Sequence, residues 1–190
     1  ARVKPGDRIK IASISDITGQ YVEVKGAATR LGRFAWVPGM RVSSIIQSLE
    51  SSLRPEADKH YAAIVRTDSA TDAIAVINLR LREALTNPGS SEDVSLQEKD
   101  QLLIFADEGK IRAGKTDQDQ SDTGEDGHSN APTAREIDFS LYSRESLFAP
   151  VLTRLKAQAK PGAPQQTIQV TGPVRYPGEY PLPESRKVTD

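Results

Sequence analysis

An internal repeat at an offset of 146 residues constrains the fold of this chain more than any other feature of the sequence. Residues 22–26 (VEVKG) align without a gap with residues 168–172 (IQVTG). In both copies a second glycine follows six residues after the closing glycine, and an aromatic residue follows two residues later. An alternating strand, a glycine-bounded turn and a returning strand are typical of an antiparallel hairpin. The repeat therefore predicts two hairpins of the same design.

The four glycines of the repeat are predicted turn residues, because they bound the connection between the paired strands. They are Gly26, Gly32, Gly172 and Gly178. The second copy stops at Asp190, at the point where the first copy begins a predicted helix. We therefore expect a truncated second domain at residues 165–190, in a chain that is a segment of a longer protein.

One complete unit is expected over residues 18–107, with an α+β fold in which a mixed sheet is crossed by one main helix. The main helix is predicted at residues 42–53, where four apolar residues recur at helical spacing and Pro55 closes the segment. The predicted strands are residues 21–25, 33–37, 61–66, 73–79 and 102–105, with a short helix at 79–85 and a turn at 87–89.

The remaining segments are read as connectors. Residues 3–11 weakly resemble residues 96–104, so residues 1–17 are interpreted as the tail strand of a preceding module plus a connector. An acidic linker is expected at residues 108–137, because its centre has acidic but no basic residues and no large apolar group.

A helical connector is expected at residues 138–164, where an apolar stripe recurs at helical spacing. The stripe consists of Leu147, Phe148, Val151, Leu152 and Leu155. Pro150 lies within the stripe and is expected to split or kink the helix, or to begin its second half.

The composition excludes several kinds of chemistry. The 190 residues include no cysteine, which excludes disulfides, thiolate nucleophiles and cysteine-ligated zinc. The formal net charge of −1 argues against a protein that mainly holds nucleic acid. The two histidines, His60 and His128, lack the spacing of metal ligands, and the acidic residues near Asp117 lack the pattern of an EF-hand loop. No phosphate-binding loop or nucleophile elbow is present, so no catalytic residue, metal or cofactor is predicted.

Five residues are candidates for ligand binding. Trp36, Tyr176 and Tyr180 offer ring faces on which a sugar could stack, although core packing is the favoured interpretation for aromatic residues in so small a sheet. Arg33 and Arg66 carry forked donors that suit acidic glycans, and both equally suit an ordinary charged surface.

The repeat resembles the opening of the soluble-ligand-binding β-grasp (SLBB) domain. Residues 24–34 and 170–182 show its valine-rich strand, glycine turn and aromatic residue, and residues 96–104 match its closing strand. The first copy departs from the family pattern at residues 31, 51–52 and 98–99. This resemblance implies β-grasp-like domains in tandem, joined by the acidic linker and the amphipathic helix.

The tandem arrangement that the repeat predicts is similar to that of the SLBB domains in bacterial polysaccharide export proteins. The resemblance implies a non-enzymatic part of a periplasmic, outer-membrane-associated assembly that exports capsule or exopolysaccharide. It also implies a homo-oligomeric ring, contact with polysaccharide and an inner-membrane export partner. No nucleic acid partner is expected, because the net charge is near zero, and no membrane span is expected in this segment, because no run approaches the roughly 20 apolar residues that a span needs. The alternatives are a β-grasp module that binds another soluble ligand, such as a cofactor or DNA during uptake, and a glycan-active enzyme, which only the abundance of carboxylates favours.

Overall fold

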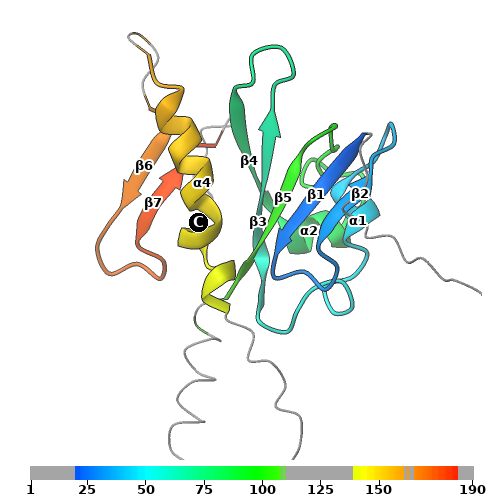
Figure 1. Ribbon diagram of the computed structural model, residues 1–190. Coiled ribbons are helices and arrows are strands. Elements are labelled where there is room, and N and C mark those ends of the chain that lie inside the picture. The colour runs from blue at the N-terminus through cyan, green and yellow to red at the C-terminus, as the bar shows by residue number, and fades with distance from the viewer. Residues whose placement is uncertain (1–19, 108, 110–138, 161, 163–164, 184–190) are drawn as a thin grey trace, which may run out of the picture.

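The computed structural model of the chain describes residues 20–107, 109, 139–160, 162 and 165–183. The protein has an α+β fold in which a five-stranded mixed sheet and a two-stranded hairpin lie on opposite sides of helix α4 (Arg144–Ala157) (Figure 1). The tail strand expected within residues 1–17 and nearly all of the acidic linker lie outside the described residues.

The five-stranded sheet has the order β2-β1-β5-β3-β4. Strands β1 and β5 are parallel, whereas the β1–β2, β3–β4 and β3–β5 pairs are antiparallel. All five strands predicted for this unit are confirmed, and β3 is longer than expected. They are β1 (Tyr21–Gly26), β2 (Gly32–Ala35), β3 (Ala57–Thr67), β4 (Ile74–Arg80) and β5 (Gln101–Ala106).

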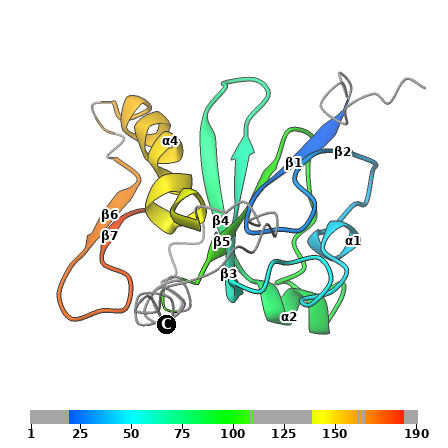
Figure 2. The same cartoon turned by 60° about the horizontal axis from the view of Figure 1, so that its bottom comes forward.

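The sheet is the middle layer of the molecule, because both of its faces are covered. Helices α1 (Val42–Ile45) and α2 (Leu81–Thr86) lie on one side and α4 on the other (Figures 1 and 2). On β5, Leu102 and Ile104 belong to the core under α1 and α2, while Leu103 and Phe105 belong to the core under α4. Burial on both faces explains why β5 is an unbroken apolar run rather than an alternating one.

The prediction of a main helix over residues 42–53 is wrong, because α1 ends after four residues at Ile45. Serine hydroxyl oxygens accept hydrogen bonds from backbone N–H groups that would bind backbone carbonyl groups in a longer helix. Ser52 Oγ accepts from the backbone N–H groups of Gln47 and Ser48, and Ser48 Oγ accepts from those of Glu50 and Ser51. Serine side chains compete with the helix in this way. The apolar residues of the predicted stripe still contact the core, but they reach it from a turn rather than from a helix.

Helix α4 lies within the segment for which the apolar stripe predicts a helix, and Phe148, Val151 and Leu155 of that stripe are buried against the sheet. Ser143 begins the helix by accepting a hydrogen bond from the Ser146 N–H. The expected split at Pro150 does not occur, and one helix continues through it. Proline removes one backbone donor, but buried residues before and after Pro150 pack in the same core against the sheet, which offsets this loss.

The two hairpins predicted from the repeat are both present and have the same pairing register. In the first, Val22 lies opposite Phe34. In the second, formed by β6 (Thr167–Val170) and β7 (Gly178–Pro181), Ile168 lies opposite Tyr180. The other three Cα pairs of each hairpin also correspond at the offset of 146.

The predicted turn glycines all have positive φ angles, in the range that favours glycine: 95° at Gly26, 102° at Gly32, 101° at Gly172 and 152° at Gly178. Gly26 has a second requirement, because a Cβ atom there would lie 1.9 Å from the carbonyl oxygen of Ile104. The close approach of β1 and β5 therefore depends on a glycine at this position.

Candidate functional site

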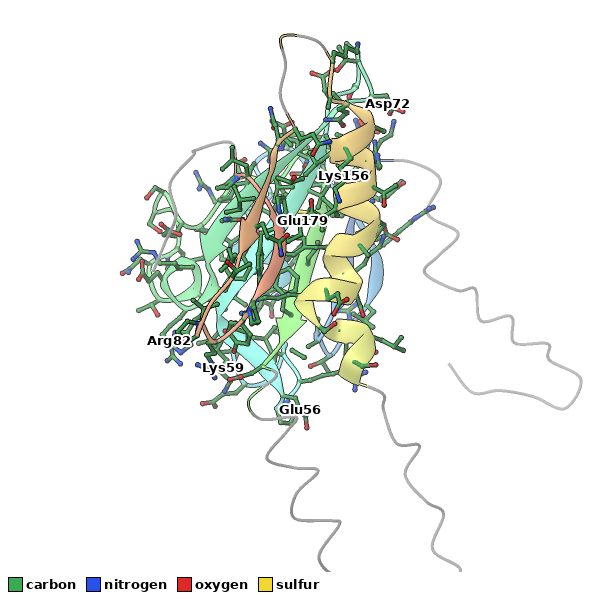
Figure 3. The ribbon with its side chains drawn as sticks, turned by 90° about the vertical axis from the view of Figure 1, so that its left-hand side faces the viewer. Glu56, Lys59, Asp72, Arg82, Lys156 and Glu179 are labelled. Atoms are coloured by element: carbon green, nitrogen blue, oxygen red, sulfur yellow. The ribbon has the colours of Figure 1, made fainter. Side chains whose placement is uncertain are left out.

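A cavity of about 800 Å³ lies between the sheet and the second hairpin. Strands β3 and β4 supply one wall, including Tyr61 and Asn78, and β6 and β7 supply the other, including Ile168 and Tyr180. Figure 3 faces this side of the molecule, with the hairpin in front of the sheet and Arg82 and Lys59 at its lower edge. We call this cavity, with its lining residues, the hairpin cleft. Its volume is within the range of about 300–1,000 Å³ that is typical of small-molecule sites.

Arg144, the first residue of α4, is the central cation of the hairpin cleft. Its side chain is only 8 % exposed, and Nη2 forms an ion pair with Oδ2 of Asp58 on β3. The other Asp58 oxygen accepts from the backbone N–H groups of His60 (2.8 Å) and Tyr61 (3.3 Å). Arg144 Nη1 is shielded from solvent and has no hydrogen-bond partner among the described residues. A buried donor without a partner is destabilising, so this atom requires an explanation.

Aromatic rings enclose the Arg144 guanidinium. Its Cζ lies 3.7 Å from the ring centroid of Tyr176 and 5.5 Å from that of Tyr61. The Tyr61 ring in turn stacks on Phe105 at 5.4 Å. Burial raises the pKa of Tyr61 above its ordinary value, and the nearby Arg144 opposes that change. Tyr61 is therefore a neutral hydroxyl at physiological pH, and it donates to the Asn78 side-chain oxygen at 3.0 Å.

The loop between β6 and β7 is tied to the end of β5 through Asp107. The Tyr176 hydroxyl donates to Asp107 Oδ1 at 3.1 Å, and Arg175 Nη2 donates to the same oxygen at 2.9 Å. Tyr180 then donates its hydroxyl to the backbone oxygen of Tyr176 at 2.9 Å. Burial raises the pKa of Tyr176, so this ring also stays uncharged near neutral pH. These contacts hold Tyr176 over Arg144.

The lining of the hairpin cleft contains four arginines and three carboxylates. Arg144 is paired with Asp58, Arg175 with Asp107, and Arg80 with Glu83 and Glu92. Arg82 is exposed at the rim and makes no ion pair within the described part of the chain. The cleft therefore offers a small excess of positive charge beside tyrosine rings and the apolar side chains of the hairpin. This combination suits a ligand with ring faces and an anionic group.

Two of the five predicted binding residues, Tyr176 and Tyr180, line the hairpin cleft together, and three do not. Trp36 packs against the core under α1 and α2 and donates its indole N–H to the Leu96 carbonyl at 2.8 Å. Its surroundings therefore favour the core interpretation.

The two predicted arginines are engaged elsewhere. Arg66 binds both carboxylate oxygens of the buried Asp100, with Nε–Oδ1 at 3.1 Å and Nη2–Oδ2 at 2.8 Å. This pair fixes the turn that leads into β5. Arg33 lies over the Tyr21 ring at 4.4 Å, on the β1–β2 hairpin.

No sequence pattern predicts the Arg144–Asp58 pair, because its members are 86 residues apart in the chain. A lone arginine next to a capping serine is common at helix starts, and an aspartate in a charged stretch is equally ordinary. Only the packing of α4 across the sheet brings the two together.

Among the described residues, no three histidine, cysteine or acidic side chains gather as a metal site, and no helix is long and apolar enough to cross a bilayer. Comparison with protein-family models, with curated proteins and with solved structures gave no match.

Proposed function

We propose that this chain is a non-enzymatic β-grasp module of a bacterial polysaccharide export protein, acting in the periplasm next to the outer membrane. The observation that carries the proposal is the repeat of one hairpin in one register, first inside a five-stranded sheet and again at the C-terminal end of the described residues. It supports the SLBB resemblance because the resemblance rests on those same two segments of the sequence.

The strand order gives separate support for the β-grasp part of the proposal. A β-grasp sheet places the first and last strands side by side and parallel, with a hairpin on each flank. Strands β1 and β5 have this relation, with Glu23 opposite Gln101 and Gly26 opposite Ile104. The helix α1 is much shorter than a β-grasp helix, which is consistent with a divergent copy.

The hairpin cleft supports a binding role for the module. Tyrosine rings, an amide and arginine side chains lie together in the space between the repeated hairpin and the sheet. Protein sites for sugars combine ring faces with hydrogen-bonding groups in this manner. On this proposal, part of the polymer or of a partner in the export assembly contacts the module here, and a ring of copies forms the wall of the assembly.

Disruption of the gene in the source bacterium tests the proposal. We expect polymer to be made but retained in the cell, and an intact gene to restore its release. A gene carrying Gly26→Val should fail to restore release, because the β1–β5 pairing cannot form. Leu31→Ala, at an exposed position of the same hairpin connection, is the matched control and should restore it. Unchanged release after disruption would contradict the proposal.

Two further measurements separate the alternatives. New reducing ends after incubation of the protein with the exported polymer would indicate a glycan-active enzyme. Loss of DNA uptake, with polymer release intact, would indicate the DNA-binding alternative.

A further inference from the structure

We propose that Arg144 is the carboxylate-recognising residue of the hairpin cleft, and that the cleft binds a segment of an acidic polysaccharide through a uronic acid residue. The choice of a glycan rests on the proposed function. The requirement for a carboxylate rests on the geometry around Arg144.

The first argument is the unsatisfied donor. Arg144 is more than nine-tenths buried, lines the cavity, and has Nη1 without a partner among the described residues. A guanidinium presents its donors as a planar fork that matches the two oxygens of a carboxylate. A ligand carboxylate at Nη1 would satisfy the donor that the folded chain leaves unpaired.

The second argument is that Asp58 does not fully neutralise Arg144, so the guanidinium can bind a second anion. Its Oδ1 is engaged by two backbone N–H groups, and its Oδ2 by Arg144 Nη2. The negative charge of Asp58 is therefore shared among several donors rather than directed at the guanidinium alone. The further arginines of the lining reduce the repulsion between Asp58 and an incoming carboxylate.

The third argument is that the cover over Arg144 can be displaced. Tyr176 belongs to the connection between β6 and β7, not to a strand, and its hydroxyl donates a hydrogen bond to Asp107. Arg175 also binds Asp107, so this carboxylate keeps a cationic partner when Tyr176 leaves. Movement of one tyrosine would open Nη1 to the cavity, and its ring could then stack on the sugar.

The rest of the hairpin cleft suits a sugar chain better than a small inorganic anion. The side chains of Ile168, Val170 and Val174 line it, and these can cover the apolar face of a sugar ring. The side-chain oxygen of Asn78 already accepts from Tyr61, which orients its amide nitrogen as a donor for a hydroxyl. Arg82 at the rim could meet a second carboxylate further along the polymer.

Calorimetric titration of the full chain with tri-galacturonate, and with neutral galactotriose as the matched sugar, tests the proposal. We expect the acidic trisaccharide to bind at least about tenfold more tightly, as a charge-assisted fork predicts. Arg144→Lys keeps the charge but loses the fork, and should weaken binding of the acidic sugar by about tenfold. Arg154→Lys is the control on the same helix, because Arg154 is not a lining residue of the hairpin cleft and its side chain donates to the backbone oxygen of Asp72. The affinity of this variant for tri-galacturonate should be unchanged.

Tyr176→Phe keeps the test decisive if Arg144→Lys does not fold. It keeps the ring over Arg144 but removes the hydrogen bond to Asp107, so the cover should open more easily. We expect tri-galacturonate to bind about threefold more tightly, which corresponds to roughly half of one hydrogen bond. A purely structural role for Tyr176 predicts unchanged or weaker binding, and that result would overturn the proposal.

Two other outcomes would also overturn it: equal affinity for the acidic and the neutral trisaccharide, or binding of hexaglutamate without binding of either sugar. The second outcome would identify an acidic peptide as the ligand. If the purified protein does not bind tri-galacturonate but disruption of the gene still abolishes polymer release, this inference is refuted and the proposed function stands. If the protein binds the acidic sugar tightly but disruption of the gene leaves polymer release unchanged, carboxylate recognition at Arg144 is supported and the proposed export function is refuted.

Discussion

The two hairpins share a pairing register, but their apolar residues are buried to different extents. In the first, Val22 and Val24 are 0 % and 1 % exposed and belong to the core of the sheet. Their counterparts in the second, Ile168 and Val170, are only half-buried and line the hairpin cleft. The local sequence therefore determines the hairpin, whereas its neighbours determine whether the apolar face becomes core or the wall of a cavity.

The neighbours of the two hairpins explain this difference. The first hairpin is continued by the parallel strand β5, so its residues lie in the middle layer of the molecule. In the second hairpin, β6 and β7 pair with each other and with no other strand among residues 20–107, 109, 139–160, 162 and 165–183. This hairpin packs on α4, more through β7 than through β6. Figure 2 shows β6 and β7 beside α4, away from α1 and α2.

The largest expected difference between the hairpins lies in their first glycines. Gly26→Ala should destabilise the protein by about 3–5 kcal/mol, because positive φ costs about 1–2 kcal/mol and the Cβ would overlap the Ile104 carbonyl. Gly172→Ala has the same φ problem but no atom within 4 Å of the new Cβ, so about 1–2 kcal/mol is expected. Urea denaturation of both variants measures the difference, and equal losses would contradict the assigned roles.

Phe148 tests whether the second hairpin depends on α4. Its ring centroid lies 4.8 Å from that of Phe105 in the sheet and 6.0 Å from that of Tyr180 in the hairpin, the latter pair edge to face. Phe148→Ala should cost about 3 kcal/mol and release the hairpin from the sheet. Hydrogen exchange should then accelerate in β6 and β7 much more than in β1 and β2. Equal acceleration in the two hairpins would show that α4 does not set them apart.

The matched pair Val22 and Ile168 separates core from cleft. Val22→Ala should cost about 2 kcal/mol, because it leaves a cavity in a fully buried layer. Ile168→Ala removes more atoms but from a half-buried site, so less than about 1 kcal/mol is expected. Thermal melts give both stabilities, and binding of tri-galacturonate should weaken only in the second variant. A larger loss at Ile168 would reverse the assignment.

The repeat also shows how far the sequence can predict this fold. Hairpin positions, register and turn glycines follow from short-range rules, because strand alternation and positive φ act over a few residues. The apolar stripe at residues 42–53 predicts a longer helix than the structure has, because the hydroxyls of Ser48 and Ser52 terminate it. Of the four apolar residues of that stripe, Ile46 and Leu53 are buried, and Ile45 and Leu49 pack against the same core while partly exposed.

The site was harder to predict than the fold. The two tyrosines of the repeat could be identified as candidates, because aromatic residues in a repeated hairpin stand out in a chain with few of them. Arg144 and Asp58 could not, because their pairing depends on how α4 crosses the sheet. The charge of Arg66 suggests an anionic ligand, but its guanidinium binds a buried aspartate in the turn before β5.

The smallest expected effect is a pH dependence confined to the second hairpin. Lys156 Nζ of α4 lies 2.6 Å from Glu179 Oε2 of β7, and Figure 3 shows the two side chains close together. The Lys156 hydrogen bond lowers the pKa of Glu179 below its ordinary 4.5. A lowered folded-state pKa means that the stabilisation is complete above the unfolded pKa and is lost as pH falls through the folded value. Both groups are partly exposed, so the effect should be small. Thermal melts of the wild type and of Glu179→Gln should differ slightly at pH 7 and converge in acid, once the pH falls below the folded-state pKa of Glu179. A difference that persists in acid would assign the stabilisation to packing rather than to charge.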